Sequence, residues 1–152
     1  MEANKKERYK RIRVQLQDLF SKNNVLLSRM ATINALLYHK FPTFSWVGFY
    51  LLENMSLTIG PYQGPLACLT LQLNKGVCWK GINEKVIVNV PDVHEFPGHI
   101  ACDPATKSEI VIPVLSNEKT VIGVLDIDSK QPGNFDLTDE EELQMIVEML
   151  MQ

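Results

Sequence analysis

The chain has 152 residues, with 15 basic and 18 acidic side chains and a formal charge of −3 at neutral pH. This length predicts one domain spanning residues 1–152, and 45% hydrophobic with 22% charged residues exclude a disordered or fibrous chain. The acidic balance argues against nucleic acid as a partner, and the longest uncharged stretch, residues 54–74, is interrupted by two Gly-Pro pairs, which argues against a membrane span.

The first 42 residues are expected to form two helices. Apolar residues recur at helical spacing within residues 7–20, and a second apolar stripe runs through residues 26–37. Ser21 is a candidate cap for the second helix, and Pro42 should end it. The pair should pack on a sheet or on a partner subunit.

From Phe44 the pattern changes to that of strands. Residues 44–52 are aromatic and apolar, and residues 56–59 form a candidate return strand. The Gly-Pro pairs that follow should break the chain before a third strand at residues 67–73. A short helix near Val77 and a short strand at residues 86–90 are then expected.

The remaining chain predicts a loop, a hairpin and a last helix. Residues 91–99 hold two prolines, a glycine and two histidines, as in an ordered surface loop. Residues 109–115 and 120–128 form a candidate hairpin. Thr138 and Glu141 have capping-box spacing at the start of the last helix. Hairpin-connected strands between terminal helices predict an α+β fold, with an antiparallel sheet and helices on one side.

The two ends of the chain carry opposite charges. Residues 1–13 hold six Lys/Arg and residues 136–152 hold six Asp/Glu. We favour two solvated helix faces as the interpretation, because exposed ion pairs contribute little. Attraction between the ends, within one chain or between two chains of a dimer, is the alternative.

Three carboxylates should gather at one end of the hairpin. Alternation places Val124, Asp126 and Asp128 on one face with Ile122, opposite the face of Val121, Gly123, Leu125 and Ile127. Asp126 and Asp128 then lie roughly 7 Å apart. Glu109 falls opposite Asp126 if the hairpin centres on residues 117–118, or opposite Asp128 if the register shifts by two. The cluster is either a solvated strand end, or a site that holds a cation or keeps one acid protonated.

The three cysteines have distinct settings. The odd number argues against a secreted disulfide scaffold, and the charged N-terminus lacks an apolar signal core, so we expect a cytoplasmic protein. Each thiol has a simple alternative as a small buried apolar side chain. Cys68 lies in a candidate strand and Cys102 in a polar loop. Cys78 lies at a candidate helix start, which would favour its thiolate.

Metal and nucleotide chemistry lack support. Cys78, His94, His99 and Cys102 are conceivable zinc ligands, but structural zinc sites offer two closely spaced pairs and only His99 and Cys102 are close. No phosphate-binding glycine pattern occurs. His94 and His99 could either tune Cys102 or bond the loop backbone, and we favour the structural role.

Six stretches together resemble the free methionine-(R)-sulfoxide reductases, a family with the GAF fold. They cover about residues 44–130 in the family's order: Ser45-Trp46-Val47-Gly48-Phe49-Tyr50, residues 60–68, Gly76-Val77-Cys78, residues 92–94 with 97–103, Ser108-Glu109-Ile110-Val111, and residues 123–129.

The resemblance implies a central antiparallel sheet with flanking helices and a ligand pocket on one sheet face. It also implies reduction of free methionine-(R)-sulfoxide to methionine, with thioredoxin as reductant and without a metal or organic cofactor. Members of the family are commonly homodimers, so a homodimer is expected here.

The resemblance also assigns roles to single residues. Cys102 matches the nucleophile, Cys68 the resolving cysteine, and Cys78 a third cysteine that is auxiliary or a second resolving thiol. The acidic groups that handle the sulfoxide oxygen and the substrate ammonium match Glu109, Asp126 and Asp128; the pocket aromatics match Trp46 and Tyr50. Trp79 departs from the family pattern, which has a small residue there, and a bulky ring could reshape the wall beside Cys78.

These roles imply a mechanism. A neutral carboxylic acid, Glu109 or Asp128 depending on the register, protonates the sulfoxide oxygen. The Cys102 thiolate attacks sulfur, methionine leaves, and Cys68 condenses with the resulting sulfenic acid. The Cα atoms of the two cysteines must then lie within ~7 Å. Trp46 would cover the substrate methyl group, or simply pack in the core. Backbone N–H groups near Cys78 would hold the substrate carboxylate.

Two other functions remain possible at this point. The first is a sensory GAF module that binds a small ligand such as a cyclic nucleotide, although an acidic cluster suits an anionic ligand poorly. The second is a thiol redox switch, in which Cys68 and Cys102 are oxidised by peroxide without turnover of a small molecule.

Overall fold

The structure, a computed structural model, describes residues 2–99 and 102–152. Residues 100 and 101, part of the family-like stretch before Cys102, lie outside the described residues. Six strands form one antiparallel sheet in the order β3-β2-β1-β6-β5-β4. The elements are α1 (Glu2–Ser21), α2 (Leu26–Lys40), β1 (Trp46–Glu53), β2 (Ser56–Gln63), β3 (Thr70–Leu71), α3 (Gly76–Glu84), β4 (Val88–Val90), η1 (Val93–Glu95), β5 (Ser108–Leu115), β6 (Val121–Ser129), α4 (Leu137–Glu148) and η2 (Met149–Met151).

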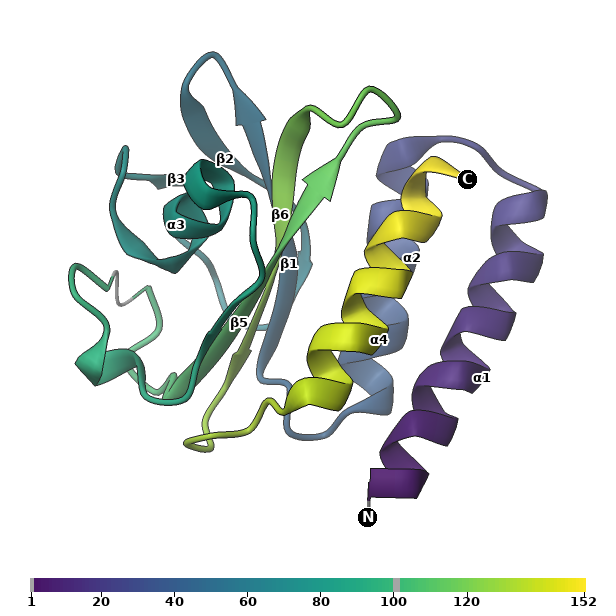
Figure 1. The fold of residues 1–152 in the computed structure, drawn as a ribbon, viewed down its shortest axis with the longest axis horizontal. Coiled ribbons are helices and arrows are strands. Elements are labelled where there is room, and N and C mark those ends of the chain that lie inside the picture. The colour runs from purple at the N-terminus through teal and green to yellow at the C-terminus, as the bar shows by residue number, and fades with distance from the viewer. Residues whose placement is uncertain (1, 100–101) are drawn as a thin grey trace.

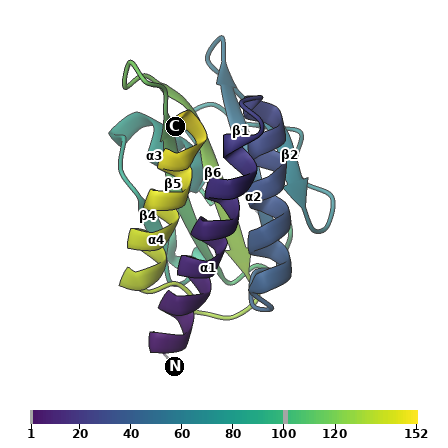
Figure 2. The same cartoon turned by 90° about the vertical axis from the view of Figure 1, so that its right-hand side faces the viewer.

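The helices cover the two sheet faces unequally (Figure 1). Helices α2 and α4 pack on one face, and α1 packs on both of them as an outer layer, which Figure 2 shows from the helical side. Helix α3 and the loops lie on the opposite face. The α+β fold with an antiparallel sheet and flanking helices is confirmed, whereas the expectation that both N-terminal helices pack on the sheet holds for α2 and not for α1.

Each sheet face has its own apolar core. The helical side buries a cluster that includes Ile12, Leu37 and Phe49, and the opposite side buries a smaller cluster that includes Trp79 and Val124. The smaller cluster surrounds the cavity described below. Within the described residues, no helix combines the length and apolarity needed to span a membrane.

Two predicted helix caps are wrong. Ser21 is the last residue of α1, and α2 begins after Val25, which makes no side-chain cap. The capping box of α4 uses Asp136 and Asp139, two residues before the pair that we expected, Thr138 and Glu141. Both carboxylates of the actual box accept backbone N–H bonds, so spacing alone did not distinguish two overlapping candidates. The end of α2 just before Pro42 is confirmed.

Two strand predictions also fail locally. Gly60 and Pro61 were expected to break the chain, but strand β2 continues through them. Both residues lie opposite Phe49 alone at a register shift, which is a bulge. A bulge tolerates proline because the missing N–H is not needed for strand pairing there. A second irregularity near the β5–β6 turn places Val121 in the cluster of Val124 and turns Ile122 to the helical side. The expected alternation holds from Gly123 to Asp128.

The oppositely charged ends meet within one chain. Lys5 pairs with Asp136 at 2.8 Å and with Asp139 at 2.7 Å, and Arg13 pairs with Glu142 at 2.9 Å. The favoured interpretation of two solvated faces is therefore wrong. Asp139 and Glu142 are buried where α1 covers α4, and a buried carboxylate needs a partner.

Candidate active site

A cavity opens on the sheet face that carries α3. Its walls come from β1, β5, β6, the start of α3 and the loops that carry Cys68 and Cys102. Of the site residues expected from the sequence, all except Cys68 line it: Trp46, Tyr50, Cys78, Cys102, Glu109, Asp126 and Asp128. Cys68 is joined by a disulfide to one of these lining residues, Cys102. The fold therefore brings together residues that are up to 82 positions apart in the chain (128 − 46).

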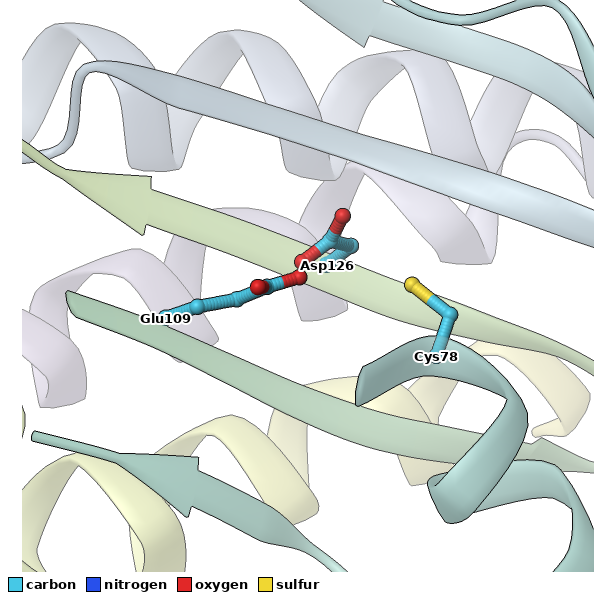
Figure 3. Close-up of side chains that lie close together, drawn as sticks. All are labelled: Cys78, Glu109 and Asp126. Carbon is cyan, nitrogen blue, oxygen red and sulfur yellow. The ribbon is translucent and has the colours of Figure 1, made fainter. Parts of the chain in front are cut away.

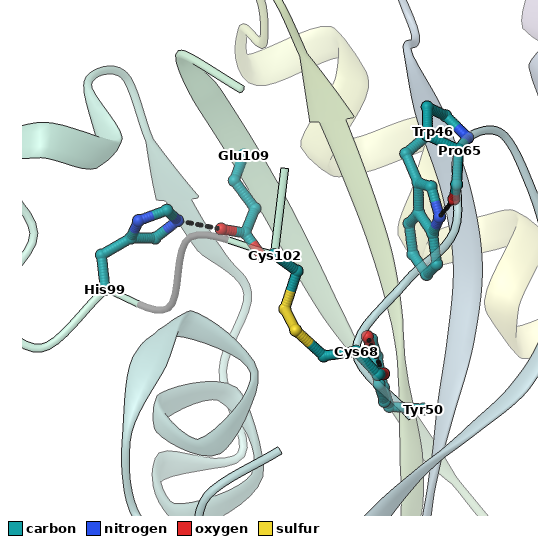
Figure 4. Close-up of a disulfide and its surroundings, with 7 residues drawn as sticks. All are labelled: Trp46, Tyr50, Pro65, Cys68, His99, Cys102 and Glu109. Atoms are coloured by element: carbon teal, nitrogen blue, oxygen red, sulfur yellow. Dashed lines mark hydrogen bonds and ion pairs between the residues drawn. A yellow bond between two sulfur atoms is a disulfide. The ribbon is translucent and has the colours of Figure 1, made fainter. Parts of the chain in front are cut away.

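Cys68 and Cys102 form a disulfide at the cavity (Figure 4). Their Cα atoms are 5.6 Å apart although 34 positions separate them in sequence. The distance meets the requirement for a bond between the two thiols. Both residues are half-buried, and each lies in a loop rather than in a strand as expected for Cys68.

The β5–β6 register decides how the carboxylates meet. Glu109 lies opposite Asp128, and Asp126 lies opposite Val111, which is the second of the two registers considered above. Burial and the neighbouring Asp128 raise the pKa of Glu109 to about 8. Burial, followed by the charge of a neighbouring carboxylate, raises the pKa of Asp126 and of Asp128 well above the usual range. The solvated strand end is therefore excluded, and Glu109, with a pKa of about 8, holds its proton near neutral pH.

Cys78 is a buried thiol next to the acids (Figure 3). Burial and the charges of Asp126 and Glu109 raise its pKa well above the usual value. The expectation that the start of α3 stabilises a thiolate is wrong, because desolvation and three nearby carboxylates outweigh the helix end. Cys78 is thus a proton donor to its neighbours in this state.

The donor atoms here favour protons over metal ions. One atom each of Cys78, Glu109 and Asp126 lies within 4.8 Å of the other two. A metal binds the deprotonated forms of such groups, and burial disfavours those forms here. The conceivable zinc set does not assemble either, since Cys102 is in the disulfide and His94 is exposed beside Asp92.

Aromatic rings form one wall of the cavity. The Trp46 ring stacks between Tyr50 and Tyr62, with centroid distances of 5.9 and 5.4 Å. Gly48 makes this possible, because a Cβ there would overlap the Trp46 ring. The Trp46 Nε1–H donates to the Pro65 carbonyl (Figure 4). The indole therefore has one polar contact and an apolar face.

Tyr50 ties the wall to the disulfide. Its hydroxyl donates to the carbonyl oxygen of Cys68 at 2.9 Å (Figure 4). Trp79, the residue expected to reshape this region, is buried in the apolar cluster and its Nε1 lies 3.5 Å from the Leu71 carbonyl. It does not line the cavity.

Two cavity residues, His99 and Thr106, occupy positions that the sequence did not predict. The His99 ring lies 3.4 Å from the Glu109 carboxylate (Nε2 to Oε2), and so it is more than a structural loop residue. The buried Thr106 hydroxyl has no hydrogen-bond partner among the described residues. Neither the residue type nor the sequence spacing of Thr106 indicates a place in the cavity, whereas His99 lies in a family-like stretch that indicates one.

The start of α3 also contributes to the cavity. Lys75, Gly76 and Val77 line it, and Lys75 caps the helix without a side-chain hydrogen bond. Backbone N–H groups of the first turn are then free of a side-chain cap and suit an anion.

Comparisons with known proteins agree with this geometry. The GAF domain model matches residues 6–152. The chain is 40% identical over 147 residues to free methionine-R-sulfoxide reductase of Escherichia coli, covering 97% of this chain and 88% of the relative. It is 39% identical over 128 residues to the protein of the same name in Saccharomyces cerevisiae, covering 80% and 71%.

A solved structure extends the likeness to the fold. The free methionine-R-sulfoxide reductase of Neisseria meningitidis, in complex with its substrate, superposes with a TM-score of 0.88 at 35% identity, covering 93% of this chain and 85% of that one. The matches to the Escherichia coli protein and to the Neisseria meningitidis structure cover 97% and 93% of this chain. The chain belongs to the GAF domain family and, within it, to the free methionine-R-sulfoxide reductases.

Proposed function

We propose that this protein reduces free L-methionine-(R)-sulfoxide to L-methionine. The observation that carries the proposal is the Cys68–Cys102 disulfide beside a cavity lined by three carboxyl groups, of which the buried Glu109 has a pKa of about 8. A disulfide is the product expected after two thiols have given two electrons to a sulfoxide. The family relationship supports the same reaction.

The reduction begins from the dithiol state. Glu109 or Asp128, which lie opposite each other, protonates the sulfoxide oxygen. The Cys102 thiolate attacks sulfur, and the hydroxyl passes to the cysteine as methionine leaves, which gives a sulfenic acid. The Cys68 thiol then displaces water from that sulfenic acid and forms the disulfide. The oxygen and two protons leave as water, and two thiol sulfurs supply the two electrons.

The cavity suits the charged ends of a free amino acid. One buried oxygen of Asp126 has no hydrogen-bond partner among the described residues, so it offers an acceptor to the substrate ammonium, whose charge favours ionised Asp126. The carboxylate would rest on the N–H groups at the start of α3. The apolar faces of Trp46 and Tyr50 would cover the methyl group.

The remaining parts of the proposal concern recycling and assembly. Thioredoxin would reduce the disulfide by thiol–disulfide exchange, so that no metal or organic cofactor takes part. Cys78 would be auxiliary, since the disulfide leaves it as a free thiol. We also propose that residues 1–152 act as one domain, that two chains form a homodimer, and that the protein works in the cytoplasm.

A coupled assay tests the function. Purified protein, thioredoxin, thioredoxin reductase and NADPH should oxidise NADPH with the (R) epimer of free methionine sulfoxide and not with the (S) epimer. Cys102→Ser should abolish the signal. Full activity of that variant would remove the proposed nucleophile. Tight binding of a cyclic nucleotide without reductase activity, or disulfide formation by peroxide alone, would favour a sensory module or a redox switch.

A further inference from the structure

His99 connects the buried Glu109 to the outer part of the cavity. It lies in the loop after η1, and its ring points at the carboxylate of Glu109 on β5 (Figure 4). Nε2 and Oε2 are 3.4 Å apart, and the two side chains are 15% and 8% exposed. The histidine is therefore the more exposed member of a close pair.

The other groups that face Glu109 are acids. Asp126 and Asp128 approach from β6, and Cys78 approaches from α3. Asp103, in the loop that carries Cys102, acts on Asp128. Lys75 lines the cavity at the start of α3. Of the groups in contact with Glu109 in the described chain, His99 alone has two ring nitrogens that can take up a proton on one side and release it on the other.

We infer that His99 is a positioning residue of the proposed reductase, which orients the Glu109 carboxyl and returns a proton to it after each reduction. The inference rests on the proposed function and adds a route for the proton. Burial lowers the pKa of His99, so the ring is neutral at pH 7 and can hold its single proton on Nε2.

The proton balance of one turnover shows the need for this route. When Glu109 gives its proton to the sulfoxide oxygen, it is left as a buried carboxylate. The proton that Cys102 lost on becoming a thiolate is in the solvent. His99 Nε2–H donates its proton to Oε2 of Glu109 while Nδ1 takes up the proton that Cys102 released to the solvent, which restores the acid. Exchange of the ring proton with solvent then returns it from Nδ1 to Nε2, so that the histidine is also restored, and no oxidation state changes.

Multiple-turnover kinetics test the inference, because the proton must return to Glu109 before a second reduction. Protein is mixed with free methionine-(R)-sulfoxide and saturating dithiothreitol, and methionine is measured against time over many turnovers between pH 5.5 and pH 9. His99→Ala should slow methionine formation by about 100-fold, at the lower end of the contribution of a positioned proton-transfer group. Added imidazole should restore most of the rate to His99→Ala and leave the wild type unchanged. The substrate concentration giving half the maximal rate should change little.

His94→Asn is the matched control, because His94 is an exposed histidine in η1, just before that loop, and contacts Asp92 instead. It should behave as the wild type. An unchanged rate and pH profile in His99→Ala, or a slow rate that imidazole does not restore, would overturn the inference. If His99→Ala does not fold, His99→Gln is measured, and a wild-type pH profile there has the same meaning. A wild type that forms no methionine would instead contradict the proposed function itself.

Discussion

Glu109 and Asp128 are direct partners across the β5–β6 pair, with both carboxyl groups on the face that lines the cavity. Like charges in this arrangement destabilise a sheet, and here Glu109 is also buried and Asp128 is half-buried. A proton on Glu109, whose pKa is about 8, removes one of the two charges near neutral pH and allows the strands to pair. The same proton would make Glu109 the general acid of the proposed reduction, so chemistry rather than the fold would explain a locally unfavourable pairing.

The first prediction concerns stability against pH. The pKa of Glu109 is about 8 in the folded protein and 4.5 for an unperturbed glutamate. A raised pKa stabilises the fold fully below the unfolded value, and this contribution is lost as the pH rises through the folded value. Each pH unit between the two values corresponds to about 1.4 kcal/mol, so the Tm of the disulfide form should fall between pH 5 and pH 8.

Glu109→Gln tests the origin of that fall. The amide keeps the size of the side chain and cannot ionise, so calorimetric melting of the variant should depend less steeply on pH. Asp126 and Asp128 still titrate, and part of the slope should remain. Glu118→Gln, an exposed glutamate in the turn of the same hairpin, serves as control and should keep the wild-type slope. Equal slopes in all three proteins would show that Glu109 is not the source.

The second prediction concerns the reactivity of Cys78. Its thiol is buried and its pKa is raised, so the thiolate that alkylating reagents require is scarce. At pH 7 the disulfide form should gain no iodoacetamide adduct by intact mass within hours. In denaturant it should gain one, at Cys78. The reduced protein should gain adducts first at Cys68 and Cys102. Rapid labelling of Cys78 in the folded disulfide form would contradict its burial.

The sequence predicted the parts of the site that depend on local pattern. Alternation in β6 placed Asp126 and Asp128 on one face without knowledge of the sheet, because side chains in a strand alternate with period two. The family likeness paired Cys68 with Cys102. The sequence pattern could not distinguish the two hairpin registers, since a shift of two residues leaves the buried face unchanged.

Other features depend on three-dimensional burial. Cys78 was expected to be a thiolate from its place at a helix start, but its charge is decided by Asp126 and Glu109 from other strands. Attraction between the charged ends was the less favoured interpretation, and the ion pair of Lys5 with Asp139 forms because α1 covers α4. The helix start at Cys78 and the charged ends of the chain lie where the local pattern placed them. Contacts between distant elements decide the protonation of the thiol and the pairing of the charges.

The third prediction concerns the reductant. Leu69 follows Cys68 and is 68% exposed, so we expect a protein that attacks the disulfide from this side to contact it. Leu69→Ser should raise the KM for thioredoxin several-fold, since one exposed leucine buried at an interface contributes about 1 to 2 kcal/mol. Turnover with dithiothreitol should stay the same. Leu137→Ser, equally exposed at 66% and located at the start of α4, should change neither value. Equal KM values in both variants would mean that thioredoxin avoids this side of the disulfide.

The fourth prediction separates the helical layer from the chemistry. The Tyr9 hydroxyl on α1 donates to Asp139 on α4 at 2.7 Å, and both residues are fully buried. Tyr9→Phe should lower the free energy of unfolding in urea by about 1 to 3 kcal/mol, because it leaves a buried carboxylate with one partner fewer. Methionine formation in a single turnover should keep its rate, since the sheet separates this contact from the cavity.

Tyr38→Phe is the control, because the Tyr38 hydroxyl makes no hydrogen bond within the described residues. The loss of that hydroxyl should therefore lower the free energy of unfolding by less than about 0.5 kcal/mol. A destabilisation no larger than that of Tyr38→Phe would show that Lys5 alone satisfies Asp139.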